Sequence, residues 1–233
     1  RLPGLLALCL LLAGCFDNNS NTTLPESGLQ TFTSAGLQRS YYLDLPSDYD
    51  PAAAPRPLII AYHGTGGSHQ AWFDDYRLRE VVGDGAILIY PDALPNAANI
   101  NQWDFANDFQ MFEDLLERLP AQLNFDASRI FITGHSSGGG FAHELGCRYG
   151  NRIRGIAPVA GSLTTTTCIG AVAVLQIQGQ YDPLVPIGVA DVKRAGDDVT
   201  IICHSKTVAP ALNAAKTLSD EGISAEVIDL RTI

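Results

Sequence analysis

The sequence has no block of basic residues. Its 233 residues include 15 Lys and Arg against 25 Asp and Glu, which gives a net charge of −10. Proteins that bind nucleic-acid backbones need clustered Lys and Arg to displace counterions, so no nucleic-acid partner is expected. The five cysteines form no CxxC pair and no His/Cys cluster with zinc spacing. A structural metal is therefore not expected either.

The sequence also has no apolar run of the roughly 20 residues that a membrane-spanning helix needs. The short run Leu5–Leu12 instead has the character of a signal-peptide core, with the signal peptide expected at residues 1–15. It ends in LAGC, which resembles a bacterial lipobox and predicts lipidation at Cys15. Residues 16–30 would then be a polar tether, and the chain an exported lipoprotein whose only membrane contact is this anchor. Alternatively, cleavage occurs elsewhere and Cys15 is incidental.

The residues that are present describe an ordinary globular chain, with 46% hydrophobic residues, 22 Gly and 13 Pro. This composition excludes a disordered, collagen-like or coiled-coil protein. Strands are predicted at 41–45, 58–62, 86–90, 129–133, 153–159 and 172–177, and helices at 109–119 and 137–148. Buried apolar strands that alternate with helices predict an α/β fold, with a mostly parallel sheet and helices on both faces.

A GxSxG motif, GHSSG at residues 134–138, directly follows the predicted strand 129–133. In this position it predicts a nucleophile elbow, in which the strand passes through one tight turn into a helix and exposes Ser136. A serine nucleophile also needs amides that hold the oxyanion. The loop HGTGG at residues 63–67 follows another strand, and we assign the backbone amides of Thr65 and Ser137 to this role. The alternative is a Gly-rich turn that Ser136 merely caps.

His63 opens the HGTGG loop and is expected to shape that loop rather than to catalyse. Asp182 follows the predicted strand 172–177 in the segment QGQYDP. A carboxylate at a strand end, after the serine in chain order, fits the acid that orients the base of a catalytic triad. A surface turn is the alternative environment for Asp182.

These segments together resemble the secreted polyhydroxybutyrate depolymerase and feruloyl esterase group of the α/β-hydrolases, over about residues 31–185. The matching segments are RSYYLDLPSDYD, PLIIAYHGTGGS, ILIYPDAL, Trp103-Asp104, RIFITGHSSGGGFAHELGCR, IRGIAPVAGSL and LQIQGQYDPLVP. The resemblance implies a serine esterase domain at 31–184 that hydrolyses small or polymeric esters, of polyhydroxyalkanoate, feruloyl or acetyl type. It implies an acyl-enzyme on Ser136, Asp182 as the acid, and no cofactor. It also implies that Trp103 lies near the acyl or aryl pocket, with a core position as the alternative.

Export implies an oxidising compartment, in which Cys147 and Cys168 are candidates for a disulfide. Two buried free thiols are the alternative. The triad base is harder to find, because the family places its histidine well beyond the aspartate, in a loop after the last strand. Only His204 follows Asp182 in this chain, in a segment with the character of a strand end. His204 is therefore a weak candidate.

The tail from Val185 to Ile233 resembles the carboxyl-terminal domain of the beta subunit of thiamine-dependent 2-oxo acid dehydrogenases, such as pyruvate dehydrogenase. It predicts a βαβ unit from strand 199–203, helix 207–222 and strand 225–230. The family domain continues beyond LRTI, and no thiamine site can be transferred to this tail. The simplest interpretation is an exported esterase joined near Val185 to a fragment of a cytoplasmic enzyme, which makes the carboxyl-terminal part of the fold atypical.

Three functions remain open from the sequence. The first is a serine esterase. The second is a catalytically dead or chimeric chain that keeps the elbow and lacks the triad histidine, and so only binds. The third is a fragment of a 2-oxo acid dehydrogenase beta subunit, which the last 50 or so residues alone support.

Overall fold

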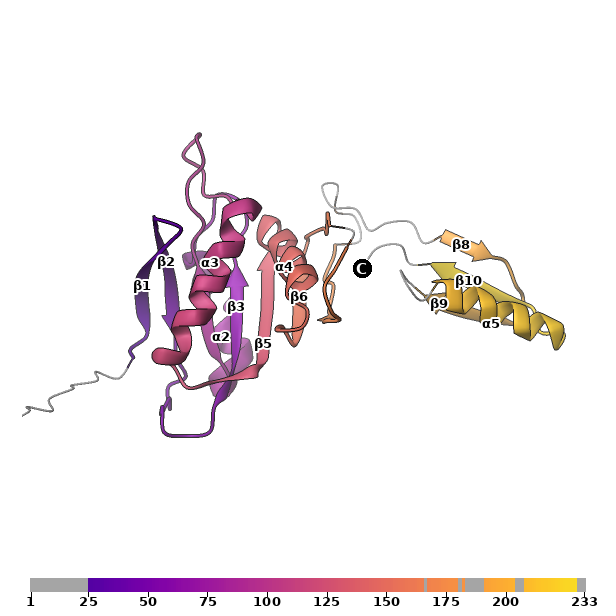
Figure 1. Ribbon diagram of the computed structural model, residues 1–233, viewed down its shortest axis with the longest axis horizontal. Helices are drawn as coiled ribbons and strands as arrows, with labels where there is room; N and C mark the ends of the chain where they lie inside the picture. The colour runs from indigo at the N-terminus through magenta and orange to yellow at the C-terminus, as the bar shows by residue number, and fades with distance from the viewer. Residues whose placement is uncertain (1–24, 166, 180–181, 183–190, 204–207, 230–233) are drawn as a thin grey trace, which may run out of the picture.

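The computed structural model describes residues 25–165, 167–179, 182, 191–203 and 208–229. In this part of the chain, a seven-stranded sheet has the order β1-β2-β4-β3-β5-β6-β7 (Figure 1). Its strands are β1 (Gly28–Ser34), β2 (Leu37–Asp44), β3 (Arg56–Tyr62), β4 (Ile87–Pro91), β5 (Phe125–His135), β6 (Gly155–Val159) and β7 (Ala173–Val174). The pairs β1–β2 and β2–β4 are antiparallel, and all pairs from β4 to β7 are parallel. The sheet is therefore mostly parallel, as predicted.

Helices cover both faces of this sheet. The helices are α1 (Gln70–Asp74), α2 (Leu78–Val82), α3 (Phe105–Arg118) and α4 (Ser137–Arg148), with short 3-10 turns at Gly83–Gly85 and Leu119–Ala121. Along β3, Leu58 and Ile60 share a buried cluster with residues of α3 and α4, whereas Ala61 belongs to the cluster of Trp72 on α1. This alternation follows from the two-residue period of a strand, and it explains why β3 is apolar on both faces from Leu58 to Tyr62.

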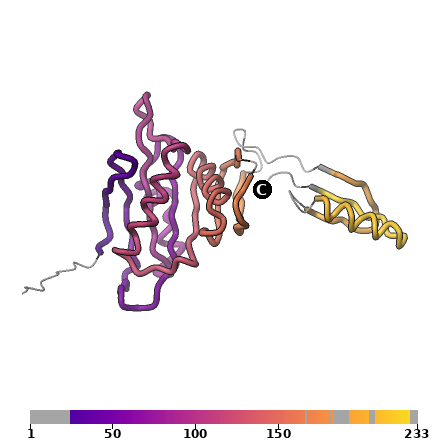
Figure 2. The backbone as a smooth tube through the Cα atoms, in the orientation of Figure 1, coloured from indigo at the N-terminus to yellow at the C-terminus, as the bar shows by residue number. Residues whose placement is uncertain are grey.

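Helices α3 and α4 lie side by side on one face (Figure 2). Phe141 of α4 stacks on Phe105 of α3, with ring centroids 5.3 Å apart. Helix α3 begins at Phe105, before the predicted residue 109, because the Asp104 carboxylate caps it by accepting a hydrogen bond from the Ala106 amide at 3.0 Å. The prediction left out Phe105, although Phe105 and Phe109 are four residues apart, which is helical spacing.

The predicted strand 172–177 is shorter than expected. Only Ala173–Val174 forms a strand, although the Leu175 and Ile177 amides continue to donate to β6 carbonyls, those of Ile156 and Pro158. The segment pairs with β6 at the edge of the described sheet, and Leu175 is exposed. The apolar run thus predicted the course of the chain correctly, but its side chains are more exposed than those of the buried strand that was predicted.

The tail forms a second sheet of order β8-β10-β9, at the yellow end of the chain in Figure 1. Its elements are β8 (Asp191–Arg194), β9 (Val199–Cys203), α5 (Val208–Asp220) and β10 (Ala225–Asp229). Strands β9 and β10 are parallel, with α5 between them in the chain, so the predicted βαβ unit is present. It has its own buried cluster of Cys203, Ala211, Ala215, Ala225 and Val227. None of the helices in the described ranges has the length and apolar character needed to cross a membrane.

Candidate active site

Ser136 occupies the turn between β5, which ends at His135, and α4, which begins at Ser137. Its backbone has φ 55° and ψ −121°, a conformation that a residue with a Cβ rarely adopts. The Ser136 amide donates to the Val159 carbonyl at 2.9 Å, which fastens the turn to β6. The side chain is exposed. The predicted elbow is thus present in geometry: a strained turn presents a serine hydroxyl to solvent at the carboxyl end of the sheet.

The glycines around Ser136 are required by close backbone approaches. A Cβ on Gly138 would lie 2.2 Å from the Tyr62 carbonyl oxygen, at the end of β3. A Cβ on Gly134 would lie 2.2 Å from the Gly138 carbonyl oxygen. Neither contact can be relieved by a side-chain rotation, because the opposing atoms belong to the backbone. The GxSxG pattern therefore reflects the space available where β5 enters α4.

The HGTGG loop lies against this turn. A Cβ on Gly64 would be 3.3 Å from the Ser136 Cβ, so the loop passes directly beside Ser136. The Thr65 hydroxyl donates to the Ser137 hydroxyl at 3.0 Å, which joins the two residues assigned to the oxyanion hole. On its other side, the Gly66 amide donates to the Asn101 carbonyl at 2.7 Å.

His63 and Trp103 hold the HGTGG loop in place through hydrogen bonds. The His63 ring is fully buried, donates through Nδ1 to the Gly64 carbonyl at 2.7 Å and accepts at Nε2 from the Ala93 amide at 3.0 Å. Burial lowers the pKa of His63, so the ring is a neutral part of the scaffold, as expected. The Trp103 indole donates to the His63 carbonyl at 2.7 Å and is only 5% exposed. These contacts match the core alternative for Trp103, although its surface also lines a shallow pocket with Gln102.

Asp182 is half-buried and follows β7 in the chain. Its amide donates to the Gly179 carbonyl at 3.2 Å, and its carboxylate accepts a hydrogen bond from the Gln178 side chain at 2.9 Å. The preceding segment is bridged to β6, since Ile177 pairs with Val159, the residue whose carbonyl fastens Ser136. Asp182 thus follows a segment tied to the strand that supports the elbow.

The structure describes four histidines, and each makes a contact with a different residue. His63 belongs to the HGTGG loop, and His69 donates from Nδ1 to the Asp92 carboxylate at 2.8 Å. His135 packs against Tyr76, with ring centroids 5.4 Å apart, and His143 contacts Gln176. The candidate base His204 lies outside the described residues, as does Cys15. The triad base is therefore not located by the described part of the chain.

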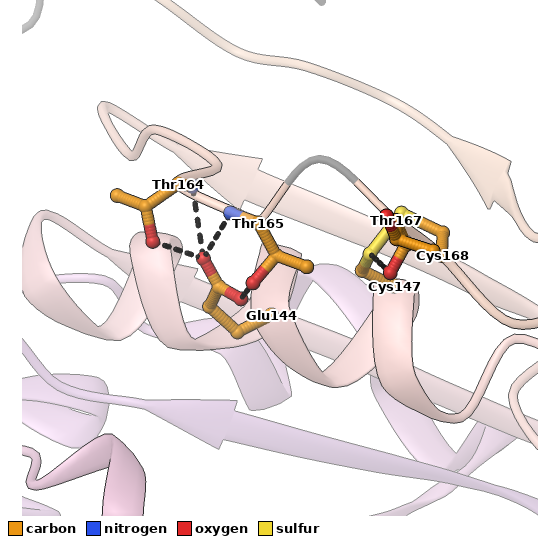
Figure 3. The surroundings of a disulfide bond; sticks show 6 residues. All are labelled: Glu144, Cys147, Thr164, Thr165, Thr167 and Cys168. Atoms are coloured by element: carbon orange, nitrogen blue, oxygen red, sulfur yellow. Dashed lines mark hydrogen bonds between the residues drawn. A yellow bond between two sulfur atoms is a disulfide. The ribbon is translucent and has the colours of Figure 1, made fainter.

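The structure brings Cys147 and Cys168 together in a disulfide, which joins α4 to the segment after β6 (Figure 3). The same helix holds this segment a second time through Glu144. The buried Glu144 carboxylate accepts hydrogen bonds from the amides and the hydroxyls of Thr164 and Thr165. Burial by itself would raise the pKa of Glu144, but the four hydrogen bonds outweigh it and lower the pKa below its usual value.

This lowered pKa predicts how stability depends on pH. The ionised Glu144 contributes to folding above the usual carboxyl value of 4.5, and the contribution is lost as pH falls through the lower value of the folded state. Glu144→Gln should therefore lower the free energy of unfolding at neutral pH by about 2 kcal/mol and flatten its fall in acid. Urea unfolding at a series of pH values measures both effects. Glu117→Gln, at an exposed position on α3, is the control, and identical profiles for the two variants would contradict the prediction.

Sequence reasoning missed three polar residues around the site. Asn101 supports the HGTGG loop, and Gln176 and Gln178 lie between α4 and Asp182. Both glutamines were visible in the segment LQIQGQYDP, two residues apart and therefore on one side of an extended chain. No local pattern indicated that His143, on a distant segment, faces them.

Known proteins resemble the chain in two separate parts. Residues 92–196 match the model of the Phospholipase/Carboxylesterase family, and residues 188–233 match the model of the transketolase C-terminal domain. "Probable feruloyl esterase C" of Aspergillus niger is 34% identical over 162 residues, which are 64% of this chain and 56% of the relative. The beta subunit of 2-oxoisovalerate dehydrogenase of Bacillus subtilis is 56% identical over 52 residues, which are 22% of this chain and 16% of the relative.

Among solved structures, a thermostable esterase superposes with a TM-score of 0.55 at 19% identity, over 86% of this chain and 53% of that chain. These similarities confirm the α/β-hydrolase fold and both resemblances found in the sequence. The chain spans little more than half the length of the feruloyl esterase that it matches.

Proposed function

We propose that the chain hydrolyses carboxylic esters through an acyl-enzyme on Ser136. The observation that carries the proposal is the exposed serine in a strained turn between β5 and α4, directly beside the loop of Thr65. A Gly-rich turn that only caps a helix gains nothing from this strain, whereas a nucleophile gains access to substrate.

The proposed reaction has two halves. The Ser136 hydroxyl attacks the ester carbonyl while a base takes its proton, and the Thr65 and Ser137 amides stabilise the oxyanion of the tetrahedral intermediate. The intermediate collapses to an acyl-enzyme, and the alcohol leaves with the proton. Water then attacks the acyl group by the same route and releases the acid. Asp182 orients the base and stabilises its protonated form.

The proposed base is His204, the histidine that follows Asp182 in the chain. The support is chain order alone, serine then aspartate then histidine, which is the order of this fold. Trp103 is proposed to support the site and also to contact an acyl or aryl group, because Trp103 lines the pocket beside Gln102.

The proposed substrates are small or polymeric esters of feruloyl, acetyl or polyhydroxyalkanoate type, without a cofactor. The relatives named as feruloyl esterases support the feruloyl class. We also propose an exported chain with a lipid anchor at Cys15, supported by the LAGC tetrad and by a disulfide between Cys147 and Cys168, which an oxidising compartment favours. Residues 185–233 are proposed as a joined dehydrogenase-like segment, supported by the separate match of the tail.

Hydrolysis of p-nitrophenyl acetate by the full chain tests the proposal. We expect turnover by the parent and none above background for Ser136→Ala. The control Ser128→Ala should keep full turnover, because Ser128 is exposed near the start of β5, at the opposite end of the strand from Ser136. Loss of turnover in His204→Ala would support His204 as the base, and retained turnover would move that role to another group. A parent rate no higher than that of Ser136→Ala would contradict the esterase proposal for this chain.

A further inference from the structure

A row of polar side chains connects the middle of α4 to Asp182. We propose that His143, Gln176 and Gln178 form a hydrogen-bond relay that positions the Asp182 carboxylate. The inference rests on the proposed function, because it assumes that Asp182 is the triad acid. It assigns these three side chains as positioning residues, which act through Asp182 and do not touch the substrate.

Four hydrogen-bond distances define the relay. His143 Nε2 lies 2.7 Å from Gln176 Oε1. Gln176 Nε2 donates to Gln178 Oε1 at 3.1 Å, and also to the Gly161 carbonyl at 3.2 Å. Gln178 Nε2 donates to Asp182 Oδ2 at 2.9 Å. Every link is within hydrogen-bond distance.

The relay has a single direction of donation. The Gln176 amide oxygen can only accept, so His143 must donate to it from Nε2. Each glutamine then accepts at its oxygen and donates from its nitrogen, and the last donor meets a carboxylate, which can only accept when ionised. Because each amide that accepts becomes a better donor, the links reinforce one another toward Asp182.

The start of the relay is fixed and uncharged. The His143 residue is only 4% exposed, and burial lowers its pKa, which keeps the ring neutral near neutral pH. The Gln176 amide is held by its second bond to Gly161, and Gly161 packs so closely on α4 that a Cβ there would lie 2.3 Å from the Gly139 carbonyl carbon. The first two groups of the relay, His143 and Gln176, are therefore held in place by burial and by hydrogen bonds.

The relay joins two parts of the proposed triad. Helix α4 begins immediately after the nucleophile, and His143 lies on that helix. Asp182 follows β7 in the chain, and its side-chain rotamer is set by the contacts that it makes. The hydrogen bond from Gln178 links one carboxylate oxygen to α4, the helix that begins directly after Ser136. Preorganised orientation of this kind is what an acid needs to align its base.

Gln178→Glu tests the relay with the least change of shape, because Glu can accept from Gln176 but, when ionised, cannot donate to Asp182. We expect kcat for p-nitrophenyl acetate to fall about tenfold or more, because the donated hydrogen bond is replaced by repulsion between two carboxylates, which moves the acid out of alignment. KM should stay within about twofold of the parent, since Gln178 does not touch the substrate. The control is Gln110→Glu on α3, since Gln110 donates to Asp114 at 2.7 Å in the same kind of pair. An unchanged kcat, or a change in KM alone, would overturn the proposal.

A second readout does not depend on turnover. The His143 Nε2–H proton is buried and hydrogen-bonded, so it should give a slowly exchanging signal in the NMR spectrum of the full chain. Gln176→Leu should abolish or strongly shift this signal, and Gln178→Glu should shift it through Gln176, whereas Gln110→Glu should leave it unchanged. If the parent has no esterase activity but the signal responds in this way, the proposed function fails and the relay stands. A signal that Gln178→Glu does not move would overturn the relay whatever the activity.

Discussion

Replacing Asp182 with asparagine should lower kcat for an ester substrate about a thousandfold or more, with little change in KM. Asparagine keeps the size of the side chain and can still accept the hydrogen bond from Gln178. It removes the negative charge that stabilises the protonated base and that selects the correct tautomer of a histidine. The loss should therefore appear in the chemical step and leave the fold intact.

Asp114→Asn is the matched control for this prediction. Asp114 also accepts a hydrogen bond from a glutamine side chain, that of Gln110, but it lies on α3 and outside the proposed site. We expect Asp114→Asn to hydrolyse p-nitrophenyl acetate at the parent rate, with the same unfolding midpoint in urea. Equal rates for the two asparagine variants would show that Asp182 is the surface-turn residue that the sequence left as an alternative.

Gly138→Ala should destabilise the chain by about 3 kcal/mol or more. The added methyl would lie 2.2 Å from the Tyr62 carbonyl oxygen and 2.5 Å from that of His63. Both atoms belong to the backbone where β3 passes into the HGTGG loop, so relief requires that loop to move away from the turn at Ser136. The variant should therefore also react more slowly with a serine-directed reagent.

Gly85→Ala provides the comparison, because a Cβ at Gly85 would meet no atom within 4 Å. Its effect on the free energy of unfolding should stay within about 1 kcal/mol. Urea unfolding measures both variants, and the amount of soluble chain provides a second measure if Gly138→Ala does not fold. Equal stabilities would mean that the elbow and the end of β3 do not approach as closely as the structure indicates.

The parts of the fold that were predictable are those whose local pattern agrees with their packing. The run Leu58–Tyr62 is apolar throughout because β3 is covered on both faces, and the GHSSG motif lies where β5 enters α4. The five-residue helices α1 and α2 were missed, since fewer than two turns leave no apolar period to detect. Strand β1 was missed because its large apolar residues do not alternate: Leu29 is exposed, and Phe32 is buried along with the polar Ser34.

The residues of the candidate site also divide into those that a local motif predicts and those that no local pattern predicts. Ser136 and the loop of Thr65 carry short motifs because crowded backbones demand glycine at fixed spacings. The relay from His143 to Asp182 carries no such motif, because it is formed by side chains of two segments that only the tertiary fold brings together. Long-range polar contacts leave no trace in local periodicity, and so sequence reasoning could name Asp182 but not the groups that orient it.

Covalent labelling of the full chain by a fluorophosphonate tests most directly whether Ser136 is an activated nucleophile. We predict stoichiometric modification, mapped by mass spectrometry to the peptide that contains Ser136, and none in Ser136→Ala. A protein that keeps the elbow but only binds esters would remain unmodified under conditions that label a known serine esterase to completion. Absence of label on Ser136 in the folded chain, or labelling that persists in Ser136→Ala, would contradict a serine esterase.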